Sequence, residues 1–184
     1  ISAPNEVQYV ALATPTEAVT AFHSGAVDAI CYNDPTITQL EQSGALRLVA
    51  DTRTVRGCAE VFGGPMPAGC LSAPTPFLVA QPKLCQALTH AMVHALKWLQ
   101  TAGPSDIIKT VPEHFFLGDR ALYLAAFSRA REAWTPDGMM PVQGPQVAAR
   151  MWAQNNASDA MDRLDLAQTF TNDYARKAKA RFKA

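Results

Sequence analysis

The chain has 184 residues, of which 48% are hydrophobic and 17% are charged, and its sixteen Lys and Arg residues balance sixteen Asp and Glu residues. This composition is typical of an ordinary folded protein and excludes a disordered chain. The zero net charge gives no broad basic surface for nucleic acid, and no run of about 20 apolar residues predicts a membrane span.

The first fifty residues predict alternating strands and helices. Three short apolar runs have the composition of strands: residues 7–12, 27–32 and 45–50. Between them, Thr14-Pro15-Thr16-Glu17 has the cap, proline and glutamate that begin a helix, and Pro35 opens a second helix that stops at Gly44. Because strands and helices alternate with short connections, this region predicts parallel βαβ units and an α/β fold class.

The rest of the chain predicts a connector followed by helices. Between Thr52 and Ala80 the helical pattern disappears, and residues 75–80 predict the entry into another strand. From Pro82 to Ala102 apolar residues recur at steps of three and four, which predicts one long amphipathic helix. Further helices are predicted at residues 105–110, 119–133, 145–155 and from 173 to the end. Residues 1–5 lack an initiator methionine and signal-peptide features, so we expect a processed or truncated chain.

The four cysteines form no C-x-x-C pair, so they predict neither a zinc knuckle nor a redox pair. Cys58 and Cys70 flank the turn-rich stretch 63–67 and are therefore candidates for one disulfide. Free thiols are the alternative. In the same stretch, Gly63 and Gly64 predict a turn or hinge rather than a phosphate loop, because the neighbouring proline lacks a backbone N–H donor.

Candidates for catalysis or metal binding are few. His90 and His94 have the spacing of a helical zinc site, but no Glu follows the first and no third ligand is evident, so we interpret them as residues on a solvated face. Glu113 and His114 follow a proline at a helix end, where charged residues commonly act as caps. No nucleophile elbow, P-loop, dinucleotide fingerprint or EF-hand loop occurs. The sequence therefore predicts no enzyme, no metal and no other cofactor.

The segment Tyr32, Asn33, Asp34 and Pro35 follows the second predicted strand and is the main candidate for ligand binding. In a parallel sheet, ligands bind beyond the carboxyl ends of strands and near helix N-termini. Asn33 and Asp34 have an equally good structural role, because either side chain could cap the helix that begins at Pro35. Both roles are compatible with one another.

Short segments along the chain carry a combined pattern: residues 21–29, 33–35, 48–53, 62–64, 67–68, 81–82, 111–112, 118–119, 165–166 and 169–172. Together they resemble the nitrate, sulfonate, taurine and thiamine-pyrimidine group of substrate-binding proteins of ABC importers. The resemblance extends over nearly the whole chain and depends on the combination rather than on any single motif.

The resemblance implies a type II periplasmic-binding-protein fold, in which two α/β lobes close around a solute by hinge motion. Residues 1–52 would be part of the second lobe, and residues 53–73, with Gly63 and Gly64, would form the crossover or hinge. Residues 74–184 would be the C-terminal part of the first lobe with its flanking helices. Most of the first lobe would be missing, so the expected fold is incomplete.

The resemblance also implies a function. The chain is expected to be the non-enzymatic solute-binding component of an ABC importer, located in the periplasm or tethered outside the membrane, and monomeric when intact. Its partners would be a small polar or anionic organic solute (a sulfonate, nitrate, taurine or pyrimidine-like molecule) and an ABC permease in the inner membrane. Two alternatives share this architecture: the ligand-sensing effector domain of a transcription regulator, and a pyrimidine-synthesising enzyme whose cysteine-rich motif is not visible here.

Overall fold

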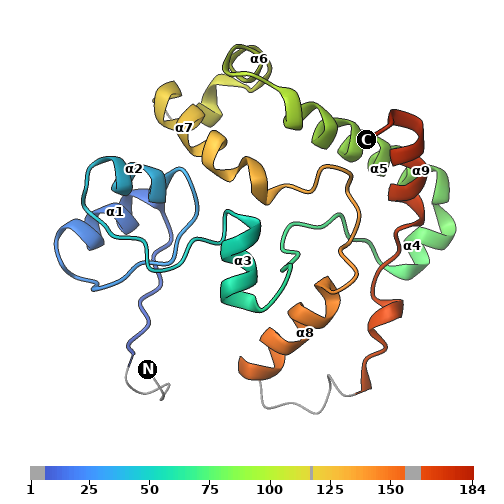
Figure 1. Ribbon diagram of the computed structural model, residues 1–184, viewed down its shortest axis with the longest axis horizontal. Helices are drawn as coiled ribbons and strands as arrows, with labels where there is room; N and C mark the ends of the chain where they lie inside the picture. Colours follow the sequence, from blue (N-terminus) through green and yellow to red (C-terminus); the bar gives the residue numbers. More distant parts are fainter. Residues whose placement is uncertain (1–6, 117, 156–162) are drawn as a thin grey trace. The chain divides into compact units, whose positions relative to one another are not determined.

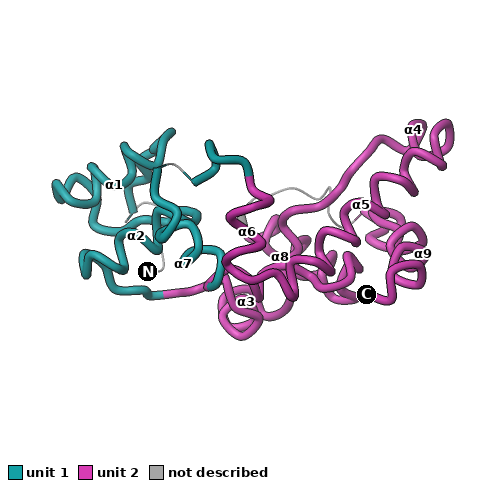
Figure 2. The backbone as a smooth tube through the Cα atoms, turned by 90° about the horizontal axis from the view of Figure 1, so that it is seen from above, with its two compact units in different colours: residues 1–49, 112–128 teal, residues 50–111, 129–184 magenta. Residues whose placement is uncertain are grey.

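The computed structural model describes residues 7–116, 118–155 and 163–184. The chain divides into two compact units (Figure 2). Unit 1 contains the chain up to residue 49 together with residues 112–128, and unit 2 contains residues 50–111 and 129–184. The first residues, on which we based the expectation of a processed or truncated chain, lie outside the described part.

The predicted α/β fold class is wrong, because the described residues form helices and no strand (Figure 1). The three apolar runs at 7–12, 27–32 and 45–50 are neither helical nor paired, and they make no backbone hydrogen bonds to one another. Strand propensity expresses fit to a paired and partly buried surface, so a β-rich run without a hydrogen-bonded neighbour stays irregular. The two-lobed periplasmic-binding-protein architecture is thus not observed. The lobe boundaries expected after residues 52 and 73 remain predictions.

Most predicted helices are confirmed: α1 (Pro15–His23), α2 (Thr36–Gln42), α5 (Pro82–Thr101), α6 (Pro104–Thr110), α7 (Arg120–Ala130) with the 3-10 turn η3 (Arg131–Ala133), α8 (Gly144–Asn155) and α9 (Asp173–Phe182). Two further 3-10 turns are η2 (Glu113–Phe116) and η5 (Leu166–Gln168). Among the described helices, none has both the length and the apolar character that a membrane crossing requires.

Two helices lie where the sequence predicted none. α3 (Val55–Phe62) falls in the predicted connector, and α4 (Thr75–Ala80) replaces a predicted strand. Local caps explain α3: the Thr54 hydroxyl accepts a hydrogen bond from the amide of Gly57 at 3.0 Å, and Gly63 ends the helix with a left-handed φ of 72°. α4 has a proline in its first turn, which favours a helix start despite the β-branched composition.

Unit 1 has a small core beneath α1 and α2. Ala18 of α1 and Leu40 of α2 are completely buried, and Phe116 of η2 is 2% exposed. In addition, Thr36 and Thr38 of α2 are buried although they carry hydroxyl groups. Two polar side chains in a core of this size require hydrogen-bond partners within the chain, in water or in a ligand.

Unit 2 is built around α5 and α9, which lie side by side (Figure 1). Val93 of α5 and Ala178 of α9 are completely buried, so small alanine residues let the two helices approach closely. At the C-terminus of α9, the Lys97 ammonium donates to the carbonyl oxygens of Phe182 and Lys183. The distance from Lys97 Nζ to the Lys183 oxygen is 3.2 Å. These bonds fix the C-terminal end of α9 against α5.

Two side chains of unit 2 make hydrogen bonds to backbone groups about 30 residues away in the sequence, one at the end of a helix and one in an irregular segment. The Arg131 guanidinium donates to the carbonyls of Leu99, Gln100 and Ala102 at 2.8, 3.0 and 2.6 Å, and so caps the C-terminus of α5. The Asn172 side chain accepts from the Met140 amide at 2.8 Å and donates to the Met140 carbonyl at 3.1 Å. Such paired bonds position segments that have no secondary structure of their own.

Gly63 and Gly64, the predicted turn, lie at the end of α3. Gly64 has a φ of 156° and is buried, and a Cβ atom there would come within 2.9 Å of the Val147 side chain. Glycine is therefore required at this position both for its conformation and for the close approach of α8. The turn is confirmed, whereas its role as a hinge remains a prediction.

The four cysteines are free thiols, and the bridge predicted between Cys58 and Cys70 is not formed in the structure. Cys58 is half-buried, with its sulfur 3.7 Å from the Gly64 carbonyl oxygen, whereas Cys70 and Cys31 are exposed. Cys85 is buried in α5. The closeness in sequence of Cys58 and Cys70 therefore does not by itself bring their sulfurs together.

Candidate functional site

A pocket in unit 1 lies where three helices begin. It has a volume of about 330 Å³, which is within the range typical of sites for small ligands. Its walls come from the first turns of α1, α2 and α7 and from the turn η2. The lining residues are Pro15, Thr16, Val19, Thr20, Pro35, Thr36, Gln39, Phe116, Asp119, Leu122 and Tyr123.

The wall from α1 is fixed by a reciprocal cap. The Thr14 hydroxyl accepts from the amide of Glu17 at 3.2 Å, and the Glu17 carboxylate accepts from the amide of Ala13 at 3.0 Å. The sequence Thr14-Pro15-Thr16-Glu17 predicts this capping box, and the structure confirms it. Pro15 and Thr16 are thereby held at the edge of the pocket.

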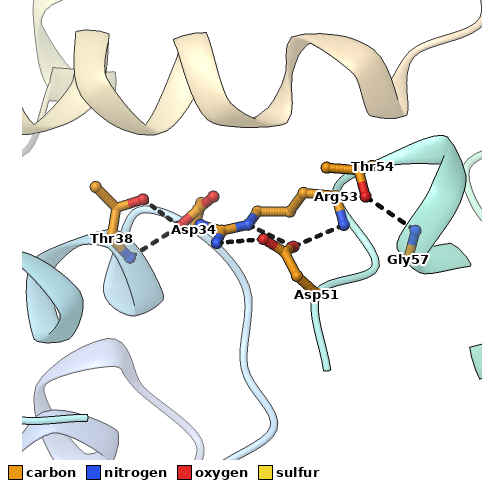
Figure 3. A network of polar contacts seen from close by, with 6 residues as sticks. All are labelled: Asp34, Thr38, Asp51, Arg53, Thr54 and Gly57. Carbon is orange, nitrogen blue, oxygen red and sulfur yellow. Dashed lines mark hydrogen bonds and ion pairs between the residues drawn. The ribbon is translucent and has the colours of Figure 1, made fainter. Parts of the chain in front are cut away.

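The wall from α2 is fixed by Asp34. Figure 3 shows one oxygen of the Asp34 carboxylate accepting from both the amide and the hydroxyl of Thr38, at 3.0 and 2.8 Å. A carboxylate before the first turn satisfies free amides of the helix and interacts favourably with its dipole. The capping role predicted for Asp34 is confirmed, and this contact positions Pro35 and Thr36 in the pocket.

The wall from η2 and α7 is aromatic, with a carboxylate at its edge. The rings of Phe116 and Tyr123 meet edge to face with their centroids 5.0 Å apart, and Phe116 is buried. Asp119 caps α7 by accepting from the amide of Leu122 at 2.8 Å. Among the lining residues, Asp119 is the one side chain that is charged at neutral pH, and it is exposed.

Thr36 is the most informative residue of the pocket. It is 2% exposed, and its hydroxyl has no hydrogen-bond partner among the described residues, in contrast to the hydroxyl of Thr38. The Thr36 oxygen is not among the enclosed polar atoms of the described chain, so it is open to the pocket, where water or a bound molecule can bond to it. Because Thr36 lines the pocket, a bound molecule is in a position to supply the missing hydrogen bond.

The predicted ligand-binding segment is divided by the structure. Pro35 lines the pocket and Asp34 holds the adjacent helix, but Tyr32 and Asn33 are not among the lining residues. Tyr32 is half-buried and Asn33 is exposed. The ligand-binding role of all four residues remains a prediction.

Unit 2 has a larger groove, of about 620 Å³, between α4, α5 and α9. None of its ten lining residues is buried as a whole, whereas Thr36 and Phe116 are buried in the pocket of unit 1, although the Gln86 side-chain oxygen in this groove is a buried atom without a hydrogen-bond partner among the described residues. Among the described residues, no group of three His, Cys, Asp or Glu side chains is arranged to hold a metal ion. We therefore take the pocket of unit 1 as the candidate site.

His90 and His94, which have the spacing of a zinc pair, pack against the end of α9. His94 stacks on the Phe182 ring with centroids 4.7 Å apart and planes 8° apart, and His90 meets the same ring edge-on at 5.7 Å.

Glu113 forms an ion pair with Arg120, whose guanidinium also lies 5.7 Å from the centroid of the Phe116 ring. These contacts place Glu113 beside the pocket wall as a structural residue.

Two polar clusters in unit 2 show depressed carboxyl pKa values. The bidentate hydrogen bonds of Arg53, at 2.8 Å each and visible in Figure 3, lower the pKa of Asp51. Burial by itself raises the pKa of Asp137, but hydrogen bonds from Lys179, the Met139 amide and Thr135 outweigh it and lower the pKa. Neither carboxylate lines the pocket of unit 1 or the groove of unit 2, and the contacts of both are with groups of the chain itself.

Comparisons with known proteins give one informative similarity. No family model matches the chain, and no curated protein matches it. The solved structure of a Bordetella bronchiseptica RB50 protein is similar, with 43% sequence identity and a TM-score of 0.83 over 91% of this chain. The match covers 53% of that protein, so the chain spans about half of its length.

Proposed function

We propose that the chain acts as a solute-binding component of an ABC importer and holds a small polar organic molecule in the pocket of unit 1. The observation that carries the proposal is the Thr36 hydroxyl, which opens into a pocket of about 330 Å³ and makes no hydrogen bond within the described chain. The sequence resemblance to substrate-binding proteins supplies the transport context. Sequestering a solute needs hydrogen-bonding groups and an apolar wall, and the pocket has both.

The chemistry of the lining narrows the ligand. Threonine hydroxyls, the Gln39 amide and the Tyr123 hydroxyl offer donors and acceptors, and Phe116 offers an apolar surface. No Lys, Arg or His lines the pocket, and the carboxylate of Asp119 lies at its edge. This set favours a solute with an uncharged polar part over a compact anion such as nitrate.

Calorimetric titration of the chain with taurine, ethanesulfonate, nitrate and simple pyrimidines tests the binding step. The proposal expects one organic member of this panel to bind the unmodified chain and to bind Thr36→Val at least about fivefold more weakly, since losing a partner of a buried hydrogen bond costs about 1–3 kcal/mol. Thr101→Val, on α5 of unit 2, is the matched control and retains binding. Equal binding by Thr36→Val, or no binding by the unmodified chain, contradicts the proposal.

The import step has a separate test. Deletion of the gene is expected to abolish high-affinity uptake of the radiolabelled ligand by intact cells, and the unmodified gene is expected to restore it. The gene carrying Thr36→Val is expected to restore uptake only at higher ligand concentration. Uptake that is unchanged by the deletion contradicts a role in import.

A further inference from the structure

The three helix starts around the pocket of unit 1 already have negative charges of the chain itself. At α1, α2 and α7, the carboxylates of Glu17, Asp34 and Asp119 each accept a hydrogen bond from a backbone amide. The N-terminus of a helix has a positive charge equivalent to about half a unit, so one carboxylate is enough to offset it. The capacity of these helix starts to bind an anion is therefore already used within the chain.

Asp119 is the carboxylate that lines the pocket. One of its oxygens caps α7 at 2.8 Å from the Leu122 amide nitrogen, and the side chain makes no further hydrogen bond or ion pair among the described residues. The neighbouring cation, Arg120, is paired with Glu113 and is not among the lining residues. The second oxygen of Asp119 can therefore accept a hydrogen bond from a bound molecule without breaking a contact of the chain.

The charges of the lining determine what this oxygen can bind. Since no Lys, Arg or His lines the pocket, an anionic group would meet Asp119 without a cation to offset the repulsion. A protonated amine is attracted to the carboxylate and supplies the N–H donors that the carboxylate lacks. The aromatic wall of Phe116 and Tyr123 can cover an apolar part of the same molecule.

We propose that Asp119 selects a solute with a protonated amino group, which donates to the carboxylate oxygen that the helix cap does not use, while the uncharged polar part of the solute bonds to Thr36. This inference rests on the proposed function, because it names the class of ligand and the residue that selects it in the same pocket. Asp119 is exposed, so water screens the attraction and the preference for an amine is expected to be modest.

Tyramine and 4-(2-hydroxyethyl)phenol test the selection, because both molecules have a phenol ring and they differ only in an ammonium group against a hydroxyl group. In calorimetric titration of the unmodified chain at neutral pH, tyramine is expected to bind at least about threefold more tightly, which is within the range of exposed ion pairs. The preference is expected to shrink at high salt, which screens such a pair. Equal affinities, or no binding of tyramine, would overturn the proposal.

Asp119→Asn separates the charge from the helix cap. Asparagine is as good an N-cap as aspartate, so the variant is expected to fold as the unmodified chain does, while the ratio of the two affinities falls toward one. The matched control is Asp165→Asn in unit 2, where the carboxylate also acts as an N-cap by accepting from the Ala167 amide at 3.0 Å. The control is expected to keep the preference for tyramine. A preference that survives in Asp119→Asn, or that the control loses to the same extent, contradicts the proposal.

Thr36→Val keeps this test separate from the test of the proposed function. If the pocket binds a solute but Asp119 does not select amines, Thr36→Val weakens binding of the neutral phenol, whereas Asp119→Asn leaves the ratio of affinities unchanged. That result overturns the inference alone. If neither probe and no member of the solute panel binds the unmodified chain, the inference and the proposed function are both overturned.

Discussion

Two neighbouring threonines of α2 give the sharpest test of the pocket. Thr36 and Thr38 are both buried, at 2% and 0% exposure, and replacing either by valine preserves the shape of the side chain. The Thr38 hydroxyl donates to the Asp34 carboxylate at 2.8 Å, whereas the Thr36 hydroxyl has no partner in the described chain. The structure therefore predicts unequal effects for two chemically identical substitutions.

The magnitudes follow from the hydrogen bonds. A bond to a charged group contributes about 1.5–3 kcal/mol, so Thr38→Val is expected to lower the free energy of unfolding by about that amount. Thr36→Val removes a hydroxyl that makes no bond within the described chain and is open to the pocket, so its effect is expected to lie within about 0.5 kcal/mol of zero. In a protein of this size, 1 kcal/mol corresponds to a shift of about 2–4 °C in Tm.

Urea unfolding followed by circular dichroism measures both variants beside the unmodified chain. The midpoint for Thr38→Val is expected to fall and that for Thr36→Val to stay nearly unchanged, with the same slope in all three. A loss of stability in Thr36→Val as large as that in Thr38→Val would show that its hydroxyl is already satisfied. That result would refute the reasoning that assigns the pocket a ligand.

Three further outcomes are expected. Gly64→Ala is expected to lower the free energy of unfolding by about 1–3 kcal/mol, because the added Cβ comes within 2.9 Å of the Val147 side chain. Gly69→Ala is the control and changes this free energy little, because no atom lies within 4 Å of the added Cβ. Equal effects of the two variants in chemical denaturation would contradict this. Since the pKa of Asp137 is lower in the folded chain, its stabilisation is complete above the ordinary value of 3.8 and is lost as the pH falls through the folded value. Asp137→Asn should therefore weaken the pH dependence of Tm below pH 4, and an unchanged acid slope would count against this. In thiol titration, Cys70 reacts at once and Cys85 only on unfolding; a Cys70 that needs prior reduction would disprove the free thiol.

Local signals in the sequence predicted the helices well. The capping box at Thr14 and the apolar spacing from Pro82 both determine structure within a few residues, and α1 and α5 begin where these signals place them. The prediction missed α3 because its cap at Thr54 lies in a stretch without clear amphipathic length. The strands were wrong because a strand needs a paired neighbour, which composition alone does not supply.

The pocket was only partly predictable. Pro35 was among the predicted residues, and the same helix start contains Thr36, which the sequence did not single out. Phe116 and Tyr123 lie about 80 residues after α2 in the sequence but line the same pocket. No pattern in a single sequence indicates that two such distant segments are close in space. The missing partner of the Thr36 hydroxyl is a property of the folded chain, so it is visible only in the structure.

Chemical-shift mapping by NMR tests the solute-binding account most directly. The isotope-labelled chain is titrated with the panel member that binds by calorimetry, and the shifts of residues 15–20, 35–39 and 116–123 are followed beside those of residues 78–90 in the groove of unit 2. The account predicts saturable changes centred on Thr36, with residues 78–90 unaffected. Changes confined to the groove, or scattered over both units without saturation, would contradict it.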